Sequence, residues 1–355
     1  MAKSDEARPV GPLETNHNRR LAELLAQVSQ AVEAAESQDG LVAAIERVRA
    51  FDGPLAFNHT RPKLVACLAL LAAALVGGYQ YYVYRHLSAP VVILMVIFGL
   101  CAVGLFIYMW RKSSRIRALA ERLYQRDLLF DNDMRELGDE LPQLEKQLFS
   151  NFYEFNRGNY SRELSAGYEG RYQGATHAIS YHFYHFHYVD KRTEVSTDSK
   201  GRVRTRTVYD HYDRYGIMLP FRYVSHLAII GKSVSGLKGS DYKPSSNRFN
   251  KLFKVIADTE MTAARFLKPT VVLACEEAAN GFSALNLEFN AQAQLCMSFD
   301  NRSVISGQQQ HDFASPDAFI EEVRGHNALP ELQRALDFIH ILMVYSDSNF
   351  RKDGE

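Results

Sequence analysis

Two uncharged runs of the sequence, Leu64–Tyr84 and Val91–Trp110, constrain the fold of this chain more than any other feature. Neither run contains Asp, Glu, Lys or Arg, and only the connector Arg85–Pro90 separates them. A helix rises about 1.5 Å per residue, so about 20 apolar residues match the roughly 30 Å hydrocarbon core of a bilayer. The sequence therefore predicts a transmembrane hairpin over residues 61–112, with spans at 64–84 and 91–110 and both long flanks on one side.

Basic residues around the two runs predict the orientation of the hairpin. Lys and Arg gather on the two flanks, at Arg47, Arg49, Arg61, Lys63, Arg111, Lys112, Arg115, Arg117 and Arg122. The connector carries only Arg85. Because short segments rich in Lys and Arg stay in the cytoplasm, we expect both termini there and the connector outside. The lipid bilayer is thus the first expected partner.

The spans themselves lack the features of a transport path. Ionisable groups inside a membrane mark ion or proton routes, and the two runs have none. Small residues recur every fourth position at Ala69, Ala73 and Gly77. Such a face lets helices approach closely, either within the hairpin or between copies of the chain. We therefore predict an anchor that supports self-association or contact with another protein.

Composition restricts the remaining partners. The chain has 41 basic and 41 acidic residues, and this zero net charge gives no general attraction to nucleic acid. Cys67 and Cys101 lie in the spans, while Cys275 and Cys296 stand far apart in the sequence. Cysteines in a reducing compartment rarely form structural disulfides. We expect no nucleic-acid partner and no cofactor.

The segments beside the hairpin have helical spacing. Residues 1–15 are polar and predict a disordered tail. Residues 16–60 and 113–160 carry apolar residues three and four apart, which predicts cytoplasmic helices. In the second segment Asp127 interrupts the apolar stripe and Pro142 suits a helix start, so we expect two helices there. Their stripes would pack against each other, with coiled-coil dimerisation as the alternative.

Residues 161–355 predict an α+β domain. Alternating patterns indicate strands at Ala178–Val189, Arg202–Tyr209, Tyr215–Phe221, Val224–Ile230, Leu285–Phe289 and Ala293–Phe299. The turn residues Asp198–Gly201 would join the first two strands into a hairpin. Helices are expected near Asp258 and at Pro269–Gly281, Asp317–Val323 and Pro330–Val344. Grouped strands and grouped helices favour a mainly antiparallel sheet with packed helices over a doubly wound sheet.

A histidine pair on an aromatic strand is the candidate for metal binding. His185 and His187 lie two residues apart, so on a strand they share one face. Two imidazoles could bind one zinc or iron ion if a neighbouring strand supplied Asp210, His211 or Asp213. No HExxH pattern supports such a site, and histidines among tyrosines also suit ordinary sheet packing. We therefore assign no catalytic, cofactor or metal residue and keep this pair as the alternative.

Two further motifs resemble anion sites. Gly231-Lys232-Ser233 matches the end of a phosphate loop, but His226 occupies the position where that loop needs its first glycine. Arg202, Arg204 and Arg206 alternate along one predicted strand and so share a face. A solvated hairpin face explains these arginines better than phosphate binding, given acidic neighbours and zero net charge.

One combination of features resembles a known family. The two-span hairpin is followed by a strand-rich middle, then by Phe249-Asn-Lys251-Leu-Phe253-Lys-Val255, Asp258, Ala264-Arg265-Phe266-Leu267 and Pro269. Over about residues 60–300 the chain is similar to an uncharacterised bacterial two-span membrane protein family, domain of unknown function family number 3137. The resemblance implies a bacterial inner-membrane protein with a cytoplasmic α+β domain. It implies no activity and no site residues.

Together these patterns predict a membrane-anchored binding or scaffolding module of unknown ligand, rather than an enzyme. The alternative is a metal-dependent enzyme with its site at His185 and His187. Metal content and chelator sensitivity separate the two, because a metal site loses most of its affinity when one ligand is removed.

Overall fold

The computed structural model describes residues 15–197 and 203–350. The predicted tail, apart from Thr15, and the predicted turn Asp198–Gly201 with Arg202 lie outside the described residues. The chain forms two compact units. The first contains the residues up to Asp127 together with Gln308–Asn327, and the second contains Leu128–Gly307 and the residues from Ala328 onwards.

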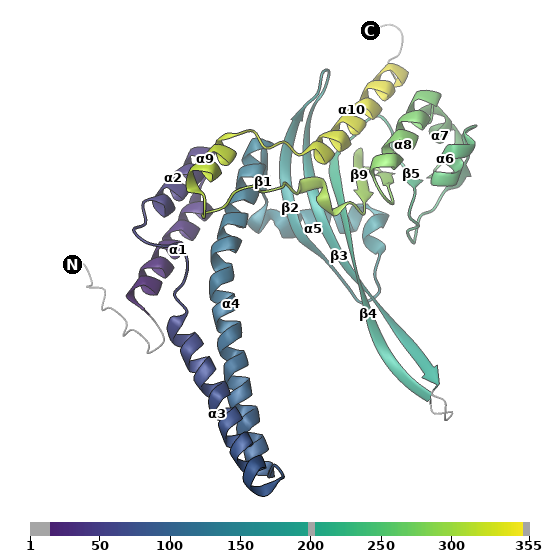
Figure 1. The fold of residues 1–355 in the computed structure, drawn as a ribbon. Coiled ribbons are helices and arrows are strands. Elements are labelled where there is room, and N and C mark those ends of the chain that lie inside the picture. Colours follow the sequence, from purple (N-terminus) through teal and green to yellow (C-terminus); the bar gives the residue numbers. More distant parts are fainter. Residues whose placement is uncertain (1–14, 198–202, 351–355) are drawn as a thin grey trace, which may run out of the picture. The chain divides into compact units, whose positions relative to one another are not determined.

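The first unit is helical. Its helices are α1 (Asn16–Ala34), α2 (Gln38–Arg49), α3 (Thr60–Tyr84), α4 (Ala89–Asp131, which leaves the unit after Asp127) and α9 (Pro316–Arg324). Helix α9 comes from the far end of the sequence and packs on α2, where Arg49 and Asp317 form an exposed ion pair of 3.1 Å. Helices α3 and α4 run side by side as a hairpin (Figure 1).

Helices α3 and α4 are long and apolar enough to cross a membrane. Only 17% and 6% of their most apolar stretches are buried, whereas a core helix of a soluble protein is mostly buried. Gly77 faces the other helix, because a side chain at this position would collide with the end of Met95. The next residue, Gly78, faces open space. The Ala69, Ala73 and Gly77 face thus contributes to packing within the hairpin, and its use between copies stays a prediction.

The structure confirms two helices in the segment after the hairpin, but the first helix ends a few residues beyond Asp127. Helix α4 continues through this position to Asp131. Asp127 is fully buried, and its two carboxylate oxygens accept hydrogen bonds from Gln38 (3.1 Å) and Asn327 (3.1 Å). These partners replace water around the carboxylate, so a charged residue is tolerated in the buried face of a helix. A new helix does begin at Leu141, with Pro142 in its first turn as predicted.

The second unit is built on a nine-stranded, fully antiparallel sheet, which confirms the α+β prediction. Its order among the described residues is β1-β2-β3-β4-β9-β8-β5-β7-β6. The strands are β1 (Met134–Glu136), β2 (Ser161–Gln173), β3 (Ala178–Thr197), β4 (Val203–Pro220), β5 (Leu227–Ile230), β6 (Ser240–Tyr242), β7 (Lys254–Ala257), β8 (Asn286–Phe289) and β9 (Gln294–Phe299).

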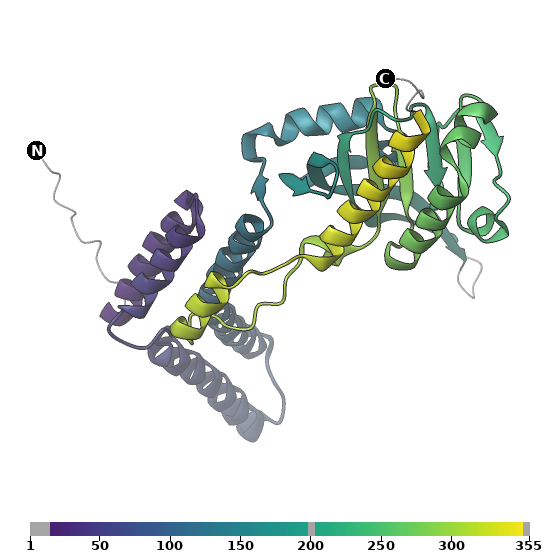
Figure 2. The same ribbon diagram turned by 90° about the horizontal axis from the view of Figure 1, so that it is seen from above.

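Helices cover both faces of this sheet (Figure 2). They are α5 (Leu141–Asn151), α6 (Asn247–Leu252), α7 (Glu260–Phe266), α8 (Pro269–Gly281) and α10 (Pro330–Phe350), with short 3-10 helices η1 (Gly138–Glu140), η2 (Tyr153–Asn156) and η3 (Arg302–Ile305). Leu144 and Leu148 of α5 share a core with Tyr184 and Phe186. On the opposite face, Phe282 after α8 contacts Phe299 with ring centroids 5.1 Å apart.

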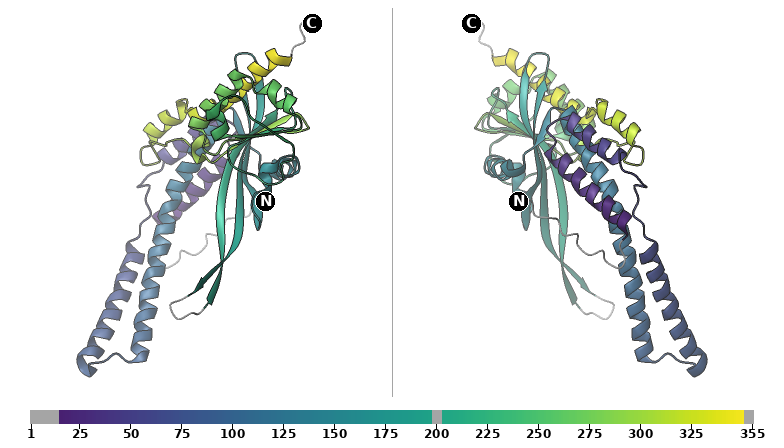
Figure 3. Two further views of the ribbon diagram at one scale, coloured as in Figure 1. Left: turned by 90° about the vertical axis from the view of Figure 1, so that its right-hand side faces the viewer. Right: turned by 90° about the vertical axis from the view of Figure 1, so that its left-hand side faces the viewer.

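Strands β3 and β4 form one long ribbon that extends beyond the rest of the sheet (Figure 3). The separate strands predicted at Arg202–Tyr209 and Tyr215–Phe221 are therefore one strand, β4. Backbone pairing with β3 continues through Asp210–Arg214, the residues between the two predicted strands. Strand β5 begins later than predicted, at Leu227, because His226 adopts a left-handed conformation (φ 53°) that ends the extended backbone.

Candidate binding site

A fully buried arginine lies at the centre of the second unit. Arg214 of β4 has no solvent exposure. Its Nε donates to Glu154 Oε1 (2.6 Å), and its Nη1 donates to Asp300 Oδ1 (2.6 Å) and to the Ala284 carbonyl (2.9 Å). Burial disfavours the guanidinium charge, but the two carboxylates outweigh this effect and raise the pKa of Arg214. Arg214 therefore stays charged inside the protein.

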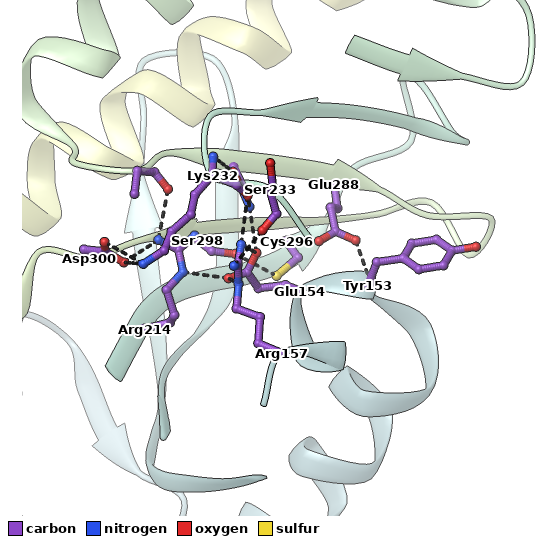
Figure 4. A network of polar contacts seen from close by, with 12 residues as sticks. Tyr153, Glu154, Arg157, Arg214, Lys232, Ser233, Glu288, Cys296, Ser298 and Asp300 are labelled. Atoms are coloured by element: carbon purple, nitrogen blue, oxygen red, sulfur yellow. Dashed lines mark hydrogen bonds and ion pairs between the residues drawn. The ribbon is translucent and has the colours of Figure 1, made fainter. Parts of the chain in front are cut away.

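Glu154, on η2, connects this arginine to a second one. Arg157 donates to both carboxylate oxygens of Glu154, at 2.6 and 3.1 Å, and Asn286 Nδ2 donates to Oε2 at 2.8 Å. Glu154 is completely buried. Figure 4 shows the two arginines converging on this carboxylate. Both oxygens of this buried carboxylate are thus occupied by side-chain donors, so Glu154 holds the cluster together.

The loop after β5 is held by the same cluster. The amides of Gly231 and Lys232 both donate to Asn286 Oδ1, at 2.9 and 2.8 Å. The carbonyls of Lys232 and Ser233 accept from Arg157, at 2.9 and 2.8 Å. A phosphate loop needs free amides that point into one cradle. Here Asn286 occupies two amides, which agrees with the sequence-based rejection of a phosphate loop.

Glu288 of β8 is the least satisfied carboxyl group beside this cluster. It is 4% exposed, and its Oε2 accepts from the Tyr153 amide at 2.7 Å. Its Oε1 has no hydrogen-bond partner among the described residues. Burial, followed by repulsion from Glu154, raises the pKa of Glu288 to about 8. Glu288 is therefore mostly protonated at neutral pH.

A pocket of about 320 Å³ opens beside Glu288. Segments from the end of α5, from η2, from β5, β7 and β8 and from the adjoining loops form its wall. The lining residues are Ser150, Asn151, Phe152, Tyr153, His226, Leu227, Ala228, Leu237, Lys238, Ile256, Asp258, Glu288, Phe289, Asn290, Ala291 and Gln292. Apolar and polar side chains share this wall about equally, and its volume suits a small metabolite that has both apolar and hydrogen-bonding groups.

The buried cysteine near the cluster is not arranged as a nucleophile. Cys296 of β9 is fully buried, and its Sγ lies 3.1 Å from the Tyr184 hydroxyl. The same hydroxyl donates to Ser298 at 3.0 Å. Gly216 permits this arrangement, because any side chain there would collide with the Tyr184 hydroxyl group. Burial raises the pKa of the Cys296 thiol, whereas a reactive cysteine needs a lowered pKa and access to solvent.

The structure brings the predicted histidine pair together with Asp213. Asp213 Oδ1 lies 2.8 Å from His185 Nε2 and 2.8 Å from His187 Nδ1, and His187 Nε2 lies 3.1 Å from His211 Nδ1. Partial burial opposes ionisation of Asp213, but the hydrogen bonds from His187 and His185 outweigh it and lower its pKa. Within residues 15–197 and 203–350, no group of three or more His, Cys, Asp or Glu has an arrangement that could hold a metal ion.

Sequence patterns did not predict the cluster around Arg214. Its members come from η2, β4, the loop after β5, β8 and the segment after β9, so their distances along the chain conceal their contacts. One signal was present in the alternation along β4. Asp210, Tyr212, Arg214 and Gly216 lie on one face of this strand, and that face is directed to the protein interior at Arg214 and Gly216. Comparison of the chain with family models, curated proteins and solved structures finds no match.

Proposed function

We propose that this protein is anchored in the bacterial inner membrane by α3 and α4, and that its α+β unit is a cytoplasmic binding or scaffolding module. The uncharged and largely unburied surfaces of the two helices support the anchor. The basic residues on both flanks of the hairpin support cytoplasmic termini.

The pocket beside Glu288 is the observation that carries the binding function. Its wall includes a protonated carboxyl group that can donate a hydrogen bond, while the neighbouring Glu154 and Arg214 are hydrogen-bonded to each other at 2.6 Å. Catalysis needs a nucleophile or base that is free to change its partner. A pocket with a mixed apolar and polar wall and a neutral acid instead favours reversible binding of a small molecule.

We do not extend the proposal to a metal-dependent enzyme at His185 and His187. Both imidazoles are hydrogen-bonded to one oxygen of Asp213, and Asp213 is about half exposed. Such an open face of a sheet gives little exclusion of water, which enzyme sites use to strengthen electrostatic catalysis. Stoichiometric zinc, iron or manganese in the purified chain, lost in both His185→Ala and His187→Ala, would reverse this judgement.

A ligand-capture experiment tests the binding function. The full chain in detergent micelles is incubated with a bacterial metabolite extract, washed, and analysed by mass spectrometry for retained molecules. Ala291→Trp places a bulky ring at the pocket rim, where Ala291 is exposed, and should abolish retention. Ala175→Trp makes the same change on an exposed turn elsewhere and should retain the wild-type ligand. No retained molecule, or equal retention by both variants, would contradict the proposal.

A further inference from the structure

The far half of β4 has an open edge. Strand β9 pairs with β4 only from Tyr215 onwards, so the edge from Val203 to Arg214 has no neighbouring strand among the described residues. Such an edge offers a row of backbone donors and acceptors to another chain, and proteins usually protect it with charged side chains (lysine above all), proline, a bulge or a short strand. Residues 203–214 contain neither lysine nor proline, and their register with β3 shows no bulge.

The other edge of the same ribbon is capped by a side chain where its pairing with β2 ends, while Arg192–Thr197 beyond this point has no neighbouring strand on that side among the described residues. Asn159 Oδ1 accepts from the Lys191 amide at 2.7 Å, and Asn159 Nδ2 donates to the Lys191 carbonyl at 3.2 Å. A side chain therefore occupies the backbone groups of β3 at the point where its pairing with β2 ends at Val189. Pairing through one edge only gives a closed dimer, whereas two open edges would allow an extended assembly.

The side chains along the open edge complement a second copy of themselves. Arg204 and Arg206 lie in the first half of the edge, and Asp210 and Asp213 lie in the second half. Antiparallel pairing of two identical edges places the basic half of one copy opposite the acidic half of the other. Opposite charges directly across two strands stabilise their pairing, and like charges destabilise it.

The length of the edge limits the register in one direction, and the charges favour one register among those that remain. A two-fold axis at Val208 places Val203 opposite Asp213 and uses the open edge almost to its end. Moving the register by two residues in one direction would place Val203 opposite Tyr215, which already pairs with β9. The register centred on Val208 also sets Arg206 opposite Asp210 twice. In the same register Arg204 lies opposite Tyr212, where a guanidinium can contact an aromatic face.

We propose that two copies of this chain associate through the open edges of β4, antiparallel and centred on Val208. The partner is a second copy, and the contact extends the two sheets into one. This surface is independent of the pocket and of the hairpin. Anchorage in one membrane would raise the local concentration of copies, since confinement makes association easier without any new contact.

Cysteine cross-linking tests the register. Val208→Cys, with Cys67 and Cys101 replaced by alanine in the full chain, should form an intermolecular disulfide, because opposed residues in antiparallel strands lie about 4.5–5.5 Å apart. Val195→Cys on the outer part of β3, itself 65% exposed, is the matched control and should stay monomeric on a reducing-agent-free gel. Equal cross-linking of both variants, or none in Val208→Cys, overturns the proposal.

Charge reversal gives a second test that does not depend on disulfide chemistry. Arg206→Glu and Asp210→Arg each create two like-charge contacts across the axis, so each variant alone should lose about tenfold in self-association measured by light scattering in micelles. A mixture of the two variants should regain association, because each new side chain then meets an opposite charge. Unchanged association of the single variants, or no recovery in the mixture, contradicts the edge contact.

Discussion

Glu288 is the residue whose chemistry departs furthest from that of its free side chain. Its pKa rises from an ordinary 4.5 to about 8 in the folded chain, with burial as the main cause. Between these pH values the unfolded chain releases the proton and the folded chain keeps it. The folded state therefore binds more protons, and the free energy of unfolding falls as the pH rises through this window.

Glu288→Gln should remove this pH dependence. We expect the stability of the variant relative to the wild type to increase by about 3 kcal/mol between pH 5 and pH 8, because glutamine keeps the shape of the protonated acid without its titration. Urea unfolding of the full chain in micelles over this pH range measures the difference. The exposed Glu277→Gln is the control and should follow the wild type. Parallel pH profiles for wild type and Glu288→Gln would show that Glu288 is ionised in the folded state.

Arg214 is the residue on which the buried cluster depends. Arg214→Met keeps much of the side-chain volume but leaves Asp300 and Glu154 without their central cation. Removing one partner of a buried ion pair costs about 3–5 kcal/mol, because the remaining charge stays buried. We expect a loss of this size in the unfolding free energy. Arg171→Met, an exposed position on β2, should change it by less than about 0.5 kcal/mol.

Two buried charged residues, Arg214 and Asp127, show where sequence patterns stop being informative. Arg214 lay outside both predicted strands, because its burial depends on Glu154, 60 positions away in the chain. Asp127 similarly suggested an interruption of the apolar stripe, because Gln38 and Asn327 were not recognisable as its partners. Periodicity predicts which residues an element buries when they are apolar. It does not predict buried charges, since their cost is offset by contacts that only the fold creates.

Among the elements, the α3–α4 hairpin is where the sequence was most informative. Two uncharged runs with a six-residue connector predicted the helices, and the helices of the structure contain both runs. The small-residue face was also identifiable, but its partner was not. The contact between Gly77 and Met95 assigns this part of the face to the hairpin itself.

Gly77→Leu should force α3 and α4 apart. The new side chain would collide with the end of Met95, which is flexible and can move partly aside, so we expect a cost of about 1–2 kcal/mol. Gly78→Leu makes the same substitution one residue later, where open space surrounds the position, and should be neutral. Titration with a denaturing detergent unfolds the hairpin and measures its stability in both variants. Equal midpoints for the two variants would place the Gly77 face against lipid.

The molecule as a whole combines a helical unit that carries both apolar helices with an α+β unit that carries the pocket and the open edge. Its α+β class followed from the grouping of alternating and helical segments. The return of α9 to the first unit did not, because nothing in Pro316–Arg324 indicates that its apolar face belongs to α2. The proposed anchor and the proposed dimer act together, since a shared membrane would hold two ribbons at high local concentration.

The orientation of this molecule can be tested directly. Short segments with more Lys and Arg stay in the cytoplasm, and the flanks of the hairpin carry many while the connector carries only Arg85. Reporter fusions at residues 40 and 350 should therefore be active as cytoplasmic reporters. A reporter inserted at His86 should be active only as an external one, and it serves as the internal control for expression and insertion. An external reporter signal at residue 350 would contradict the proposed orientation, and release of the chain from membranes by alkaline carbonate would contradict the anchor itself.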